Sequence, residues 1–265
     1  MKATAVTAMG VDVSLARGLD VVVLGPDGAV AFGPSKVALD ELGSVIRATR
    51  PAVVAIDGPP AWARSGRSRA IERQLLRLGI SIYSTPAEAA GRPFYAWMEI
   101  AIKVFGSASA EGYPTYSGLR IDGPQSIEVF PHASAVSIIG CLPPAGVRKV
   151  EFRRMALERE GACVRMLRTA DQVDAALAAL TGLRFLQGSS CDVGVPGDAV
   201  LVLPVRALPD RYRKRVESSE TVVESSFAAR VRFSGNAKQP SRALPDSGLN
   251  LEHTKKFQED RRKTR

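Results

Sequence analysis

Three short apolar segments at the start of the chain predict β-strands. Residues 4–13, 19–24 and 29–32 are rich in Val, Leu and Ala, and Gly25-Pro26-Asp27-Gly28 between the last two has the composition of a turn. Consecutive strands joined by short connections usually pair with one another. We therefore expect an antiparallel meander of three strands.

A helix and a buried strand are predicted next. Apolar residues recur at helical spacing between residues 39 and 46, and Arg50-Pro51 ends this helix before the continuous apolar run Ala52–Ile56. A continuous apolar strand that follows a helix is typical of a parallel strand covered on both faces. We expect it to lie beside the first strand, so that the carboxyl ends of the two strands are neighbours.

Further helices and strands are predicted as far as Val205. The predicted helices cover residues 70–78, 95–105, 150–167 and 171–186. The predicted strands cover residues 125–130 and 199–205, with a Gly and Pro turn at residues 194–197. The expected fold is one α/β domain of residues 1–205: a mixed sheet, made of the antiparallel meander plus parallel strands, with helices on both faces.

The residues after Val205 differ in composition from the domain. Apolar periodicity fades, and Ser, Pro, Gly and charged residues dominate, which predicts a disordered basic C-terminal tail over residues 206–265. The net charge of +9 lies mainly in this tail and therefore says little about a site in the domain. The alternative is an arm that folds on nucleic acid or on a partner, with basic clusters at residues 211–215 and 261–265.

Composition excludes several classes of protein. Hydrophobic residues make up 45% and charged residues 24%, as in globular proteins, and no apolar run approaches the ~18 residues of a membrane span, so we expect a cytoplasmic protein without membrane contact. The three cysteines are widely separated and fit neither a disulfide framework nor a paired metal motif. Of the two histidines, His132 is expected to start a helix as a structural or capping group. Catalysis is therefore expected to rest on carboxylates.

Three acids end apolar strands of the predicted sheet: Asp12, Asp57 and Glu128. Ligands of open α/β sheets bind at the carboxyl ends of the strands, and carboxylates gathered there repel one another unless cations or protons intervene. Hard oxygen ligands suit Mg²⁺ or Mn²⁺. We expect these acids to hold divalent metal. For Glu128 an ion pair with an arginine remains an alternative.

A fourth acid is expected from the alanine-rich helix at residues 171–186. Asp171 and Asp174 are three residues apart and lie on one helical face, and small alanines would let this helix approach the sheet. Asp171 fits a first-turn acid that complements the helix dipole. Asp174 is therefore the predicted metal ligand, and whether Asp171 joins the site is left open.

The segment after Asp57 is unusually basic. Arginine forks bind phosphate in a bidentate manner, and beside a metal site they would orient a nucleic-acid backbone. The alternative for any one of them is a solvated surface charge, with Glu72 as a nearby partner. The candidate phosphate-binding residues are Arg64, Arg67, Arg69 and Arg73.

Five motifs, in their order, carry a family resemblance. They are Gly10-Val11-Asp12, Ile56-Asp57-Gly58-Pro59, the helix start Arg69–Arg73, Glu128-Val129-Phe130-Pro131-His132 and Asp171–Ala176. Together they resemble the domain-of-unknown-function family DUF429, whose members are predicted nucleases of ribonuclease H-like fold. The resemblance covers residues 9–205 and implies that Asp12, Asp57, Glu128 and Asp174 bind metal. Near the last strand the chain departs from the family, because Gly197-Asp198-Ala199 stands where members carry an acid and then glycine.

The expected function is an Mg²⁺- or Mn²⁺-dependent nuclease that hydrolyses phosphodiester bonds in DNA or RNA through metal-activated water. A noncatalytic module that binds nucleic acid or protein on the same fold is one alternative. An actin-like ATPase or phosphotransferase is a weaker one, because Ser14-Leu15-Ala16-Arg17 after the first strand lacks the glycines of a phosphate cradle. The sequence leaves the choice of polymer, the pathway and the oligomeric state open.

Overall fold

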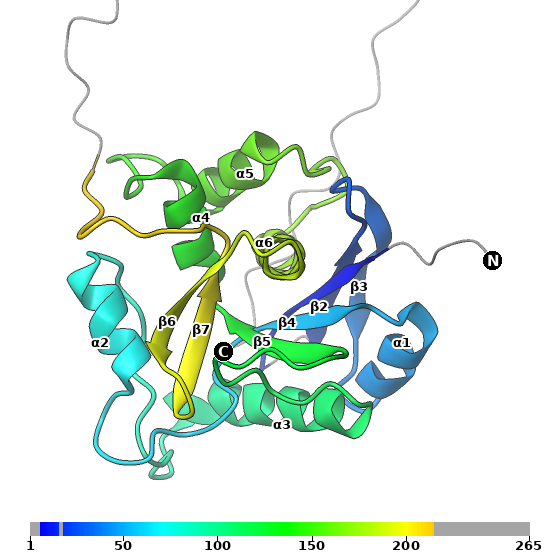
Figure 1. The fold of residues 1–265 in the computed structure, drawn as a ribbon, viewed down its shortest axis with the longest axis horizontal. Coiled ribbons are helices and arrows are strands. Elements are labelled where there is room, and N and C mark those ends of the chain that lie inside the picture. The colour runs from blue at the N-terminus through cyan, green and yellow to red at the C-terminus, as the bar shows by residue number, and fades with distance from the viewer. Residues whose placement is uncertain (1–5, 16–17, 215–265) are drawn as a thin grey trace, which may run out of the picture. The chain divides into compact units, whose positions relative to one another are not determined.

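The computed structural model describes residues 6–15 and 18–214, within which seven strands form one sheet (Figure 1). The strands are β1 (Ala8–Asp12), β2 (Leu19–Leu24), β3 (Val30–Val37), β4 (Val53–Asp57), β5 (Gln125–Val129), β6 (Cys191–Val195) and β7 (Ala199–Leu203). The helices are α1 (Leu42–Thr49), α2 (Ala70–Arg77), η1 (Pro93–Tyr95), α3 (Ala96–Ala110), α4 (Pro131–Ile139), α5 (Lys149–Arg159) and α6 (Ala170–Leu186).

The sheet combines an antiparallel meander with parallel strands. Its order is β3-β2-β1-β4-β5-β7-β6. The first three strands pair antiparallel, whereas β4, β5 and β7 continue parallel to β1, and β6 returns antiparallel along β7. This arrangement confirms the predicted mixed sheet, an antiparallel meander plus parallel strands. It also places β4 directly beside β1, as the continuous apolar run predicted.

Helices cover both faces of the sheet. Figure 1 shows α4, α5 and α6 on one face and α1 and α3 on the other. Successive strand residues point to opposite faces, so Ala8 packs in the core under α6, whereas Met9 and Val11 pack in the core under α1 and α3. Both cores are apolar, and they hold the strand ends between two helical layers.

Several elements differ from the sequence prediction: α4 is not among the predicted helix ranges, and α3 continues to Ala110 instead of ending at residue 105. The strand β3 continues past residue 32, its predicted end, to Val37, and Pro34 is accommodated because β3 is an edge strand. The helix α5 ends at Arg159, before Gly161 with φ of 74°. The strand β6 was missed, because this edge strand buries only Val193 and therefore has almost no apolar pattern.

The packed chain continues past Val205, where the tail was expected to begin. Tyr212 is buried, and its backbone N–H donates to the Leu78 carbonyl at 2.8 Å. The Arg213 carbonyl accepts from the backbone N–H of Leu142 at 2.9 Å. The predicted tail after residue 214 lies outside the described residues. Within residues 6–15 and 18–214, no helix has the length and apolar character needed to cross a membrane.

Candidate functional site

Three of the four predicted acids lie together at one edge of the sheet. Asp12 and Asp57 end β1 and β4 as register partners, and Asp174 lies on α6. One carboxylate oxygen from each residue lies within 4.8 Å of those of the other two. Asp12 is buried, and Asp57 and Asp174 are partly exposed. A group of this kind resembles the oxygen ligand set of a divalent cation.

A close approach of α6 to β1 creates this group. A Cβ atom on Gly10 would stand 1.9 Å from the carbonyl oxygen of Ala175 and 2.4 Å from the backbone nitrogen of Ala179. Only glycine therefore lets the helix backbone lie directly on the strand at this position. The contact brings Asp174, the residue before Ala175, to the end of β1.

Burial and mutual repulsion raise the pKa values of all three acids. Burial raises the pKa of Asp12 to about 8, and the negative charge of Asp174 adds to the effect. Burial and the charge of Asp12 raise the pKa of Asp57 well above its usual range. Burial raises the pKa of Asp174 to about 6, against the opposing effect of Arg153. The three carboxylates are therefore harder to ionise together than isolated aspartates are, because burial and their mutual repulsion outweigh the nearby positive charge.

Arg153 is the nearby cation that the sequence analysis did not identify. It extends from α5, and its Nη1 pairs with Oδ2 of Asp174. The other oxygen of Asp174, Oδ1, is buried without a hydrogen-bond partner among the described residues. Arg153 occurs in a helix with many charged residues, so no local signal marked it. Its role follows from the packing of α5 against α6.

Asp20 was also missed. It lies on β2 opposite Asp12, is fully buried and forms an ion pair with Lys36. Oxygens of Asp12, Asp20 and Asp171 form a second group within 4.8 Å of one another. A signal was present, because Asp20 interrupts an otherwise apolar strand, and an acid in such a place is costly to bury without a partner.

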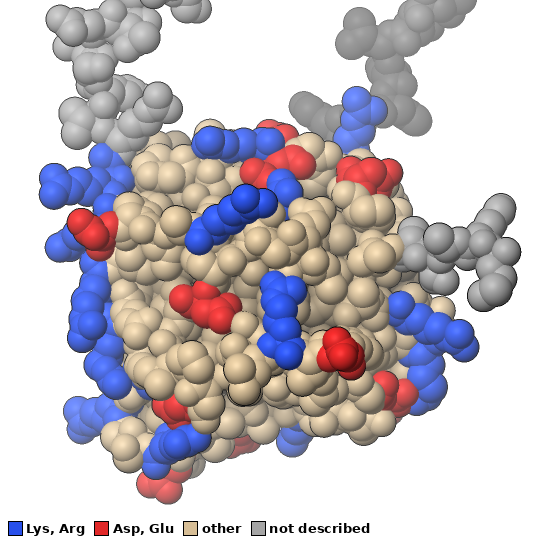
Figure 2. Space-filling model, viewed as in Figure 1, with Lys and Arg blue, Asp and Glu red and all other residues tan. Residues whose placement is uncertain are grey.

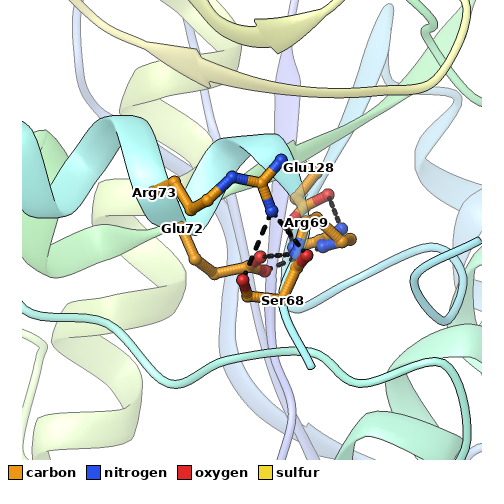
Figure 3. Close-up of polar contacts among 5 residues, drawn as sticks. All are labelled: Ser68, Arg69, Glu72, Arg73 and Glu128. Carbon is orange, nitrogen blue, oxygen red and sulfur yellow. Dashed lines mark hydrogen bonds and ion pairs between the residues drawn. The ribbon is translucent and has the colours of Figure 1, made fainter. Parts of the chain in front are cut away.

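Glu128 lies apart from the three acids. Its register partner is Ile56, whereas Asp57 is paired with Val129. Residues in register on parallel strands share a face, so Glu128 points to the face opposite Asp57. Both of its oxygens bind the guanidinium of Arg69, at 2.6 and 2.8 Å (Figure 3). The structure separates Glu128 from the acids it was expected to join, and it realises the alternative of an ion pair with an arginine.

Arg69 pairs with buried acids and does not have the exposed position expected of a phosphate-binding residue. Besides Glu128, its Nε donates to Oε1 of Glu72 at 2.8 Å, and its backbone N–H donates to Oε2 of the same residue. Figure 3 shows the guanidinium held between the two carboxylates. Arg69 is only 6% exposed. It therefore neutralises buried acids at the start of α2 and does not face solvent.

The other three arginines of this segment are exposed. Arg64 binds Oδ1 of Asp198 through Nε at 2.8 Å, and Arg73 donates to the Ser68 carbonyl at 2.8 Å (Figure 3). Arg67 is exposed on the loop before α2. Lys and Arg side chains follow the edge of the molecule at which α2 is drawn (Figure 2). These arginines are available to a polyanion, although Arg64 already has an acidic partner.

His132 has the structural position that the sequence predicted. It is in the first turn of α4, and its ring packs edge-to-face on Phe130 with 5.9 Å between centroids. Burial lowers the pKa of His132 to about 4, with Arg153 adding to the effect. The imidazole is therefore neutral near neutral pH. Among the described residues, neither group of clustered acids includes His132.

Comparisons with known proteins place the chain in a family. The solved structures that match it include Thermus thermophilus RuvC, with 16% identity and a TM-score of 0.37, and T. thermophilus RuvC in complex with Holliday junction substrate, with 17% identity and a TM-score of 0.39. Each match covers 69% of this chain and 97% of the other. No curated protein matches. The model of the family described as "Protein of unknown function (DUF429)" matches residues 10–199, and the chain belongs to this family.

Proposed function

We propose that this protein is a metal-dependent nuclease that hydrolyses phosphodiester bonds in DNA or RNA. The observation that carries the proposal is the convergence of Asp12, Asp57 and Asp174, whose oxygens lie within 4.8 Å of one another at the carboxyl ends of parallel strands. A nucleic-acid partner and a cytoplasmic location remain predictions from the sequence.

The three acids fit a divalent cation. Their raised pKa values reflect burial and mutual repulsion, which a cation would relieve. Oδ1 of Asp174 is buried and has no hydrogen-bond partner in the described part of the chain, so it has a free ligand position. Carboxylate oxygens favour Mg²⁺ and Mn²⁺ over softer metals. Asp12, Asp57 and Asp174 are therefore the residues that would hold the metal.

A bound divalent cation would supply Lewis acidity and lower the pKa of a water molecule for attack on phosphorus. The residues of the chain have positional roles around it. Asp12 and Asp57 are held on rigid neighbouring strands, and Arg153 fixes the orientation of Asp174 by an ion pair. The buried Arg69–Glu128 pair anchors the start of α2, from which the loop with the exposed arginines extends.

The exposed arginines would bind the phosphate backbone. Arg67 is exposed to a polyanion, Arg73 would turn from the Ser68 carbonyl to a phosphate, and Arg64 would exchange the carboxylate of Asp198 for a phosphate. Exposed ion pairs contribute little stability, so this exchange costs little. Arg69 and Glu128 pair with each other and would contact neither the metal nor the phosphate backbone.

Calorimetric titration of Mn²⁺ and Mg²⁺ tests the metal site without a guessed substrate. The full chain should bind metal saturably, and the Asp12→Asn, Asp57→Asn double variant should not. Asp122→Asn is the matched control, because Asp122 is an exposed acid in the loop before β5. Wild-type affinity in the double variant would contradict the assignment of the site.

Cleavage assays test the activity. Labelled single- and double-stranded DNA and RNA would be incubated with the chain in Mn²⁺, in Mg²⁺ and in EDTA. Loss of a residue that hydrogen-bonds to a metal ligand typically lowers metal affinity or activity ~10–100-fold. Asp57 would be a ligand itself, so we expect Asp57→Asn to lower the cleavage rate by more than ~100-fold. Saturable metal binding with no cleavage of any polymer would favour the noncatalytic binding module.

A further inference from the structure

A cavity of about 300 Å³ adjoins the acid group. Asp57 and Gly58 at the end of β4 form part of its wall, and Phe130 forms another part where β5 ends. Trp97 of α3 enters it because Gly58 lies against that helix: a Cβ atom there would stand 2.6 Å from Cβ of Ala101. The cavity and the proposed metal site thus share Asp57 as a common wall.

The lining of this cavity is mainly aromatic and aliphatic. Trp97, Phe130, Tyr83 and Ile82 supply apolar surface, and Thr85 supplies a hydroxyl group. Three charged residues line it: Arg69 and Glu128 neutralise each other, and Asp57 is shared with the acid group. A phosphate would find no free cation there. An uncharged planar group with polar edges fits this chemistry, and small-molecule pockets of this kind begin at ~300 Å³.

Exposed aromatic rings continue outward from the cavity. Tyr83, which lines it, is 64% exposed and contacts Phe94, which is 52% exposed, with 5.2 Å between ring centroids. Phe94 in turn contacts Tyr95 at 5.2 Å, and Tyr95 lies 6.4 Å from Trp62. Large aromatic side chains in contact on a surface commonly mark a binding site. Aromatic faces beside exposed arginines are typical of sites for single-stranded nucleic acid.

We propose that the cavity binds the base of an unpaired nucleotide and that Tyr83, held edge-to-face by Phe94, stacks on the neighbouring base. The proposal rests on the proposed function only in taking nucleic acid as the ligand. A base within a duplex is not accessible to a pocket of this size, so the substrate class is a single strand or a nucleotide that is unpaired within a duplex. Binding at the shared wall would place the adjoining phosphate beside Asp57.

Binding experiments in EDTA test the proposal without cleavage. The labelled probes are oligothymidylate, an abasic strand of the same length and charge, a paired duplex, and the same duplex with one unpaired nucleotide. We expect the full chain to bind oligothymidylate more tightly than the abasic strand. If the chain binds the interrupted duplex more tightly than the paired duplex, the base in the cavity can come from a nucleotide that is unpaired within a duplex. If it binds the two duplexes equally, the substrate class is the single strand.

Exposed aromatic residues allow variants that keep the fold. Tyr83→Ala should weaken binding of oligothymidylate by roughly 5- to 100-fold, the usual effect of losing one stacking residue, and leave binding of the abasic strand unchanged. Phe94→Ala should act in the same direction, because it removes the ring that holds Tyr83 edge-to-face. Met155→Ala, on α5 and 49% exposed, is the control and should bind as the wild type does. Oligothymidylate should also quench tryptophan fluorescence, and Trp97→Phe should remove most of that quenching.

The outcomes separate this inference from the proposed function. Equal affinity for oligothymidylate and the abasic strand, or wild-type affinity in both aromatic variants, overturns the base-binding site even if the chain cleaves nucleic acid in Mn²⁺. Base-dependent binding in EDTA, weakened by the aromatic variants, supports the site even if cleavage is never observed. Absence of binding to every probe also overturns it.

Discussion

Arg153 on α5 and Asp174 on α6 form an ion pair next to the carboxylates of Asp12 and Asp57. Arg153 is 16% exposed at its side chain, and it lowers the pKa of Asp174 against the effect of burial. Arg153 therefore places one positive charge next to the three carboxylates. The charge of Arg153 would oppose the binding of a metal ion to this group.

We expect Arg153→Gln to raise the affinity of the acid group for Mn²⁺. Removal of a like charge near a cation site strengthens the attraction, and Gln retains a hydrogen-bond donor for Asp174. The increase should be several-fold and should shrink at high salt. Calorimetric titration measures it, with Arg154→Gln as a control because Arg154 binds the Leu167 carbonyl instead. Lower affinity in Arg153→Gln would show that orientation of Asp174 matters more than charge.

Burial of the neutral His132 imidazole should make the free energy of unfolding depend on pH, and the dependence is measured as the difference between the wild type and a variant without this histidine. Its pKa in the fold is about 4, below the ordinary 6.5, so the stability that it contributes is fully present above pH 6.5 and is lost as the pH falls toward 4. The raised pKa values of Asp12 and Asp174 act in the opposite direction over this range.

Urea unfolding of the wild type and of His132→Gln isolates the histidine, because the acids are common to both proteins. The advantage of the wild type over the variant should shrink between about pH 6.5 and pH 4, by up to ~1.4 kcal/mol per pH unit. A constant difference over this range would contradict burial of the neutral imidazole.

The buried Arg69–Glu128 pair predicts a division between stability and metal binding. Arg69→Met leaves Glu128 and Glu72 buried without their cation and should lower the free energy of unfolding by ~3–5 kcal/mol. Glu128→Gln should cost less, because Arg69 keeps Glu72. Urea unfolding measures both effects. Glu128→Gln should titrate with Mn²⁺ as the wild type does, and loss of metal binding in that variant would return Glu128 to the metal site.

Gly10 predicts a large effect of one methyl group. Gly10→Ala places Cβ 1.9 Å from the Ala175 carbonyl oxygen, so α6 must move away from β1. We expect a loss of at least ~1–3 kcal/mol in the free energy of unfolding, together with weaker Mn²⁺ binding, because Asp174 moves with the helix. Gly106→Ala is the matched control: Gly106 lies in α3 with open space around it, and alanine should stabilise that helix by ~0.5–1 kcal/mol. Equal effects of the two substitutions would contradict the close helix–strand contact.

The sequence by itself determined the class of fold and three of the acids. Apolar runs predicted β1, β2, β4, β5 and β7 because buried strands have a continuous pattern of their own, independent of their partners. The order of helix and strand then placed β4 beside β1, so Asp12 and Asp57 were expected as neighbours. Asp174 could be predicted from the sequence because Asp171 and Asp174 share one face of an alanine-rich helix.

Only the tertiary structure decided the face on which each acid lies and the arginines with which Glu128 and Asp174 pair. Glu128 ends its strand as Asp57 does, but a register difference of one residue turns it to the opposite face, toward Arg69. Register depends on pairing between distant segments, and the sequence of one strand does not contain it. The same reason hid Arg153, whose partner lies on another helix, and the cavity, whose walls come from β4, β5 and α3. Local patterns therefore identified the acids, and long-range packing assigned their partners.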